Sequence, residues 1–208
     1  MTKAVSASDL TLHEVKTKFN LQQVSDESFF SEWQDGLPEI KAEEKEWCDR
    51  IKADFLSLEE YEFHEEIVKL AVLAPILSLA GFFRHPFYAN AEVQIMDEDE
   101  GQTVRGKIDV LLLKQQFWIA VIEAKNKQFS LIKALSQTLF YMMGTPFPEK
   151  PTFGLLTNGS HFMFVKVLQG KESQYALSDE FSLYRRGNEL YSVIKILRRL
   201  GQLSVTSD

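Results

Sequence analysis

Three charged residues stand within two apolar stretches of this chain, and their types and spacing suit metal-assisted chemistry. They are Asp109, Glu123 and Lys125 in the segment KIDVLLLKQQFWIAVIEAK. The apolar runs predict two strands joined by a short polar turn, Lys107–Leu113 and Phe117–Lys125. In an antiparallel hairpin with this turn, Asp109 lies opposite Glu123, with the Cβ atoms roughly 4.5–5.5 Å apart. Lys125 returns to the same face two residues later. We therefore expect two carboxylates and an ammonium group to gather on one face of a sheet.

Two interpretations of this cluster remain open from the spacing. Lys125 can neutralise one carboxylate and form an internal salt bridge, since burying an unpaired ion is costly. Alternatively, Asp109 and Glu123 hold a hard divalent cation, because adjacent carboxylates repel each other unless a cation joins them. We favour the second interpretation.

The order of these residues resembles the D…(D/E)-x-K signature of the PD-(D/E)XK nucleases, with Ile108 where the name-giving proline would stand. Three further segments resemble the N-terminal nuclease domain of type I restriction-enzyme R subunits and their short stand-alone relatives. They are an acidic helix with a proline and a terminal glycine, HEEIVKLAVLAPILSLAGFF; a Q-x-x-x-Y helix containing QTLFY; and a strand, Thr-Asn-Gly turn and strand, FGLLTNGSHFMFVKV. The resemblance covers roughly residues 60–170.

The resemblance implies a site for Mg²⁺ or Mn²⁺. Asp109, Glu123 and the carbonyl oxygen of Ala124 would hold the ion, which polarises a phosphate and lowers the pKa of a bound water. Lys125 would stabilise the developing negative charge or help to position the nucleophile. The expected reaction is hydrolysis of a phosphodiester bond in DNA.

Side chains of two predicted helices belong to the same expected site. The resemblance selects Glu65 as a third acidic group near the metal, bound directly or through water. Glu66 in that role, or a purely structural role at a helix N-terminus, remains an alternative. Gln137 and Tyr141 are four residues apart and so share one helix face. We expect Gln137 to face the active site, whereas Tyr141 either contacts nucleic acid or lies in the core.

The charge of the chain is divided unevenly. The formal net charge is −7, but residues 1–103 hold 9 Lys and Arg against 22 Asp and Glu, and residues 104–208 hold 14 against 8. The basic half therefore contains the proposed catalytic strands. Lys127 and Lys133 are our candidate contacts to nucleic acid, and a solvated protein face is the alternative for each. Further basic side chains available for phosphates are Lys150, Lys166, Arg185 and Arg186.

The organisation of the chain predicts a polar N-terminal arm over residues 1–36 and one domain over 37–208. Cys48 is the single cysteine, which excludes an intrachain disulfide and makes a cytoplasmic compartment the default. The N-terminus lacks the apolar region of a signal peptide, and no run approaches the ~18 apolar residues of a membrane span. We therefore expect no membrane partner.

Hydrophobic periodicity predicts an α/β fold. Helices are expected around residues 11–23, from Pro38 to Leu58, and over 65–80, 130–143 and 189–200; strands flank the hairpin at 91–96, 153–157 and 161–168. Pro75 is expected to kink the third helix and Gly81 to end it. The elements suit a mixed central sheet flanked by helices, and the resemblance implies a restriction-endonuclease-like three-layer sandwich.

The sequence thus predicts a metal-dependent DNA endonuclease of the R-subunit N-terminal type, with other restriction-system or helicase subunits as candidate partners. An alternative is a nuclease-like module with little or no activity that binds DNA or assembles a larger complex. Another is a structural subunit whose acidic half docks on a second protein. The oligomeric state does not follow from the sequence.

Overall fold

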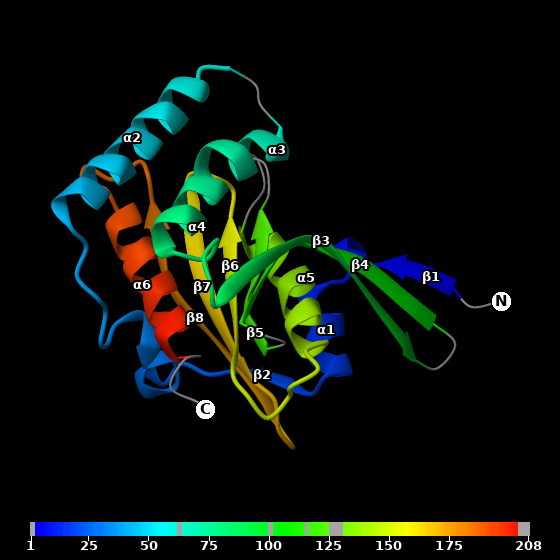
Figure 1. Ribbon diagram of the computed structural model, residues 1–208. Coiled ribbons are helices and arrows are strands. Elements are labelled where there is room, and N and C mark those ends of the chain that lie inside the picture. Colours follow the sequence, from blue (N-terminus) through cyan, green and yellow to red (C-terminus); the bar gives the residue numbers. More distant parts are fainter. Residues whose placement is uncertain (1–2, 62–63, 100–101, 115–116, 125–130, 204–208) are drawn as a thin grey trace.

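Eight strands of this chain form a single mixed sheet. The computed structural model describes residues 3–61, 64–99, 102–114, 117–124 and 131–203, and for 117–124 it describes the backbone. In this part of the chain the strand order is β1-β4-β5-β6-β7-β8-β2, and β3 pairs with β4 outside this path (Figure 1). The strands are β1 (Lys3–Ser6), β2 (Leu21–Gln23), β3 (Phe87–Asp99), β4 (Gln102–Lys114), β5 (Phe117–Ala124), β6 (Thr152–Thr157), β7 (His161–Leu168) and β8 (Ser173–Ser182).

Helices cover both faces of the sheet. One face carries α2, α4 and α6, and the other carries α1 and α5 (Figure 1). None of the described helices is long and apolar enough to cross a lipid bilayer. The helical segments are η1 (Ala7–Asp9), α1 (Leu12–Lys18), η2 (Glu27–Trp33), α2 (Ala42–Leu58), α3 (Glu65–Val68), η3 (Lys69–Leu73), α4 (Ala74–Ala80), α5 (Leu131–Met143) and α6 (Leu190–Leu203). The α/β prediction is therefore confirmed.

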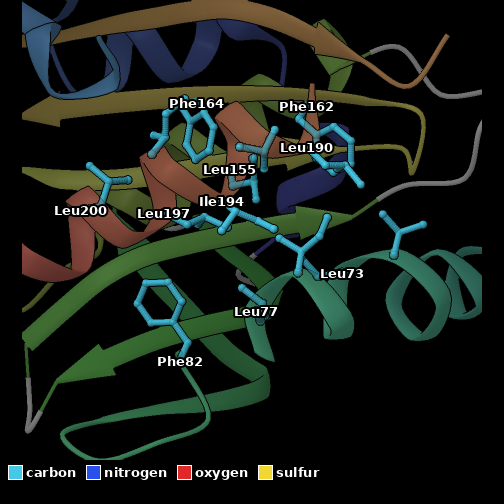
Figure 2. Close-up of a cluster of buried hydrophobic side chains, with 14 of the residues drawn as sticks. Leu73, Leu77, Phe82, Leu155, Phe162, Phe164, Leu190, Ile194, Leu197 and Leu200 are labelled. Carbon is cyan, nitrogen blue, oxygen red and sulfur yellow. The ribbon is translucent and has the colours of Figure 1, made fainter. Parts of the chain in front are cut away.

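Each face of the sheet has its own hydrophobic core, because strand side chains alternate between the two faces. Leu155 of β6 belongs to the first core and its neighbour Leu156 to the second. In the first core, Phe162 and Phe164 of β7 pack with α6 and α4 (Figure 2). The helix α6 contributes four labelled side chains there, Leu190, Ile194, Leu197 and Leu200.

The hairpin of β4 and β5 contains a change of register. At its closed end Lys114 pairs with Phe117, and continuing this register would place position 109 opposite Ile122. A shift between Leu112 and Leu113 moves the pairing by one residue, so that Val110 pairs with Ile122. The next opposed positions along the strands are then 109 and 123, in agreement with the predicted hairpin. Such a shift matters because a one-residue slip exchanges the faces of a strand.

The helical segment before β3 contains one turn of wider helix. The π-helical turn η3 joins α3 to α4 and ends directly before the first turn of α4, which contains Pro75. A proline inside a helix cannot donate its backbone hydrogen bond and clashes with the preceding turn, so a local widening is the expected response. Gly81 adopts a left-handed conformation (φ 97°) and ends α4, as predicted.

The first 36 residues differ from the expected polar arm. The strand β1 pairs in parallel with β4, and β2 pairs in parallel with β8. The helix expected over 11–23 ends at Lys18, and Asn20 takes a left-handed conformation before β2. Apolar side chains attach this region to both cores: Ala7, Val15, Leu21 and Phe30 are buried, and Leu10, Leu12, Phe19, Phe29 and Trp33 are partly buried against the cores. The partner strands lie far away in the sequence, so local periodicity does not reveal this attachment.

Other boundaries follow local sequence signals to different degrees. The strands β6 and β7 and the helix α5 lie within one residue of their predicted bounds. By contrast, α2 begins at Ala42 rather than at Pro38, and β3 is longer than residues 91–96. The strand β8 was not predicted at all. Its polar residues interrupt the apolar alternation, and its pairing with β7 is set by the rest of the sheet.

Replacing Gly159 by alanine tests the turn between β6 and β7. A Cβ atom there would lie 2.8 Å from Cε2 of Phe55 and 3.1 Å from Cγ2 of Val68, and the backbone φ is +89°. We expect Gly159→Ala to lower the free energy of unfolding by about 2–4 kcal/mol, measured by urea denaturation. Gly187→Ala is the control, because no heavy atom lies within 4 Å of its Cβ position. An equal effect of the two substitutions would contradict the packing argument.

Candidate active site

Asp109 is a nearly buried carboxylate on β4, with 7% of its surface exposed. The Lys69 ammonium, from the π-helical turn η3, donates to Oδ1 of Asp109 at 2.7 Å. The same Nζ atom lies 2.8 Å from Oε1 of Glu65, one turn earlier on the helix. Lys69 therefore joins a carboxylate of the sheet to a carboxylate of the covering helix.

The charge of Lys69 is fixed by these contacts. Burial lowers the pKa of Lys69, but its hydrogen bonds to Asp109 and Glu65 outweigh this effect and raise the pKa well above its usual value. Because the pKa is raised in the folded state, the stabilisation is fully present below the ordinary lysine pKa of about 10.4 and is lost only above it. Lys69 is therefore an ammonium ion at physiological pH.

These residues line an open pocket of about 340 Å³ between the helix, the sheet and α5. Among the described residues, its charged lining consists of four carboxylates and two ammonium groups, a formal charge of −2. They are Glu65, Glu66, Glu92, Asp109, Lys69 and Lys107. The pocket is therefore more suited to a cation than to an anion that arrives alone.

The rim of the pocket has a second ion pair and a strained backbone position. Lys107 Nζ lies 2.9 Å from Oε1 of Glu92, and this hydrogen bond holds the pKa of Glu92 below its usual value. Glu92 has a φ of 58°, which is uncommon for a residue with a side chain. In the pairing of β3 with β4, Ala91 pairs with Val110 and Val93 pairs with Ile108, whereas Glu92 between them is not paired. By this register Glu92 is the residue opposite Asp109. Strained positions of this kind cluster at functional sites.

Tyr141 packs in the core beside the pocket that contains Asp109. Its side chain is fully buried, and its hydroxyl accepts hydrogen bonds from the backbone N–H of Lys107 at 2.9 Å and from Nε2 of Gln137 at 2.8 Å. Its ring lies so close to Gly106 that a Cβ atom there would be 2.5 Å from it. Because Tyr141 also lines the pocket that contains Asp109, its contact with nucleic acid stays a prediction. Gln137 lines the same pocket as Asp109.

The other predicted site residues are only partly described or not described. The backbone of Glu123 pairs with Leu156 of β6 and faces position 109 of β4, while Ala124 is the last residue of β5. Lys133 lies on α5, and like Glu123 it has no described side chain. Lys125 and Lys127 lie outside the described residues. The roles of all these residues stay predictions.

Among the described residues, no group of three or more His, Cys, Asp or Glu side chains is arranged to hold a metal ion. The Glu123 side chain is not among them, so the pair of Asp109 and Glu123 stays a prediction.

Lys69 is the site residue that sequence reasoning missed. It is the single charged residue in the apolar stretch from Ile67 to Phe83 and stands four residues after Glu65, which are the signals that could have identified it. Lys166 differs from its prediction in another way, because the sequence suggested that it is available to bind phosphates. Its Nζ instead donates to Glu32 at 2.5 Å and to the carbonyl oxygen of Phe29 at 2.7 Å.

Comparison with known proteins gives little beyond this geometry. No protein-family model matches the chain, and no curated protein matches it. Among solved structures, the chain is similar to a fragment described as an HsdR subunit of a type I restriction enzyme from Vibrio vulnificus YJ016, with 18% sequence identity and a TM-score of 0.42. The match covers 70% of this chain and 27% of that chain, so this chain spans about a quarter of its length. Similarity at this level carries no conclusion about function.

Replacing Tyr141 by phenylalanine tests the assignment of this residue to the core. The change removes the acceptor of two hydrogen bonds, so we expect the free energy of unfolding to fall by about 1–2 kcal/mol. DNA affinity should stay the same, because the side chain is fully buried. Tyr184→Phe is the matched control, since its hydroxyl bonds to Glu59 at the exposed surface. A loss of DNA affinity with unchanged stability would return Tyr141 to the binding surface.

Proposed function

We propose that this protein is a metal-dependent DNA endonuclease. The observation that carries the proposal is the nearly buried Asp109 carboxylate, which meets Glu65 around the Lys69 ammonium in an open pocket. The backbone register, with Glu123 opposite Asp109, supports a further carboxylate at the same place. A phosphodiester is an anion, and a pocket with a formal charge of −2 would accept it only together with a cation.

The donor atoms fit a hard divalent cation. Oδ1 of Asp109 and Oε1 of Glu65 lie 2.7 and 2.8 Å from the same Nζ atom, so the two oxygens already converge on one positive centre. Carboxylate oxygens are the ligands that Mg²⁺ and Mn²⁺ prefer. Glu65, rather than the exposed Glu66, is therefore our proposed helix ligand, and Asp109, Glu123 and the Ala124 carbonyl complete the proposed set.

The proposed mechanism is hydrolysis of a phosphodiester bond. The ion, when bound, would polarise the phosphate and lower the pKa of a water molecule. Lys125 would stabilise the negative charge that develops on the phosphate. Gln137 would contribute to the pocket wall, where its hydrogen bond to Tyr141 restricts the orientation of its amide.

We further propose that the chain is of the PD-(D/E)XK type with a restriction-endonuclease-like sandwich. The support is the order of Asp109, Glu123 and Lys125, together with the mixed sheet covered by helices on both faces. DNA as the substrate, cytoplasmic localisation and a partnership with restriction-system or helicase subunits belong to the same proposal. Lys127 and Lys133 remain the proposed contacts to DNA.

A second function is favoured by one specific observation. The ion pair of Lys69 with Asp109 closes part of the site with a cation that the protein itself supplies. A nuclease-like module that binds DNA or assembles a complex without cleaving would need no other cation there. Metal-dependent cleavage distinguishes the two functions.

Replacing Glu123 by glutamine tests the nuclease proposal. A neutral amide binds a hard cation far more weakly than a carboxylate, so we expect Mn²⁺-dependent cleavage of linear, supercoiled and single-stranded DNA to be lost. Circular dichroism should show that the fold is kept. Glu66→Gln is the matched control and should retain cleavage, because Glu66 is exposed at the rim. Cleavage by Glu123→Gln at nearly the wild-type rate would remove Glu123 from the site, and its absence in the wild-type chain under all conditions would favour the second function.

The DNA affinity of the isolated chain is a separate prediction. The pocket is lined by more carboxylates than ammonium groups, and Lys166 is engaged within the protein. We therefore expect weak binding, with a dissociation constant above ~1 μM at physiological salt and contact to fewer than about four phosphates. Fluorescence anisotropy at several salt concentrations measures both quantities. Nanomolar, sequence-selective binding would contradict the prediction and would require a further surface that recognises DNA.

A further inference from the structure

The Lys69 ammonium lies where a metal ion bound by Oδ1 of Asp109 and Oε1 of Glu65 would lie. Its Nζ atom lies between one oxygen of Asp109 and one oxygen of Glu65, at 2.7 and 2.8 Å. A divalent ion that shared these two oxygens would have to approach each to roughly 2.0–2.6 Å. Two cations cannot occupy this space together, since both would be in contact with the same oxygens and would repel each other.

We propose that Lys69 is a positioning residue of the metal site, which holds Asp109 and Glu65 in place in the metal-free protein and leaves Asp109 when a divalent cation binds. The inference rests on the proposed function, because it assumes that these carboxylates bind the metal. It goes further because it states that Lys69, which is not one of the proposed ligands, lowers the affinity of the site for the metal.

The surroundings of Lys69 allow it to move. Its side chain is 26% exposed and lines an open pocket, whereas Asp109 is 7% exposed and fixed within a strand. The π-helical turn that begins at Lys69 places no other charged side chain in this part of the helix. On the rim stands Glu92, an exposed carboxylate close enough for the charge of Lys69 to act on it. Lys69 can therefore leave Asp109 without entering an apolar environment.

Lys69 also gives the site its order in the absence of metal. Two carboxylates that face each other would separate or take up a proton if no cation lay between them. The ion pair keeps both oxygens directed at one point, at the cost of competing with the metal. The metal must therefore provide enough free energy to replace the charge-assisted hydrogen bond of Lys69 to Asp109.

Lys107 provides a matched control. It lines the same pocket and also forms a hydrogen-bonded ion pair with a carboxylate, but its partner is Glu92 on the exposed rim. Lys69→Met and Lys107→Met therefore change the charge of the pocket equally. Only the first vacates the space between Asp109 and Glu65.

The experiment is a Mn²⁺ titration of the full chain, followed by the electron paramagnetic resonance signal of the free ion. We expect Lys69→Met to bind Mn²⁺ about tenfold more tightly than the wild-type chain or better, which corresponds to about 1.4 kcal/mol. Lys107→Met should gain about threefold or less, because its charge acts through solvent. If Lys69→Met fails to fold, Lys69→Gln serves in its place, since its amide can still donate to Asp109 without the charge.

The outcomes separate this inference from the proposed function. Mn²⁺ binding by the wild-type chain with an equal or weaker affinity in the Lys69 variant would overturn the inference and leave the nuclease proposal intact. An equal gain in both methionine variants would also overturn it, because a general charge effect would then suffice. No Mn²⁺ binding by the wild-type chain or by either Lys69 variant would overturn the proposed function and the inference with it.

Discussion

Asp109 places a carboxylate almost out of reach of water on a central strand, and the rest of the site follows from the need to give it a partner of opposite charge. An unpaired buried carboxylate is so costly that a cation must accompany it. In the described structure the cation is Lys69, which comes from a helix 40 residues earlier in the chain. This contact fixes the helix with Glu65 against β4, and it brings a second carboxylate to the same point. A bound metal ion would meet the same need, so the structure and the proposed catalysis both depend on a cation beside this carboxylate.

The opposite wall of the pocket depends on a contact between α5 and the same strand. The Tyr141 hydroxyl accepts the backbone N–H of Lys107, two residues before Asp109, and the missing side chain of Gly106 makes room for the ring. Since this tyrosine is fully buried, its contribution is to set the distance of α5 from β4 and to orient Gln137. The pocket is thus held from two sides by residues that pack in different cores. Its geometry should therefore be sensitive to changes in either core.

The features that local sequence predicts well are those whose cause is local. Apolar periodicity and turn residues identified α5, β6, β7 and the end of α4 at Gly81 to within a residue or so. The strands β1, β2 and β8 were not predicted from the sequence. The strands β1 and β2 are short and polar, and all three strands pair with partners that the local sequence does not specify. The same reason explains the first 36 residues. Their polar composition suggested an arm, but four buried side chains and two strand pairings attach them to the sheet.

The sequence by itself predicted that Asp109 and Glu123 stand at facing positions of a hairpin, from two apolar runs joined by a short polar turn. Only the tertiary structure supplied the shift between Leu112 and Leu113 that makes this register possible. Only the tertiary structure, too, decided that Lys69 meets Asp109 and that Tyr141 is buried. Hairpin pairing depends on neighbouring residues, whereas the packing of helices on a sheet depends on the whole core. A lysine on an apolar helix therefore reveals its partner only when the chain is folded.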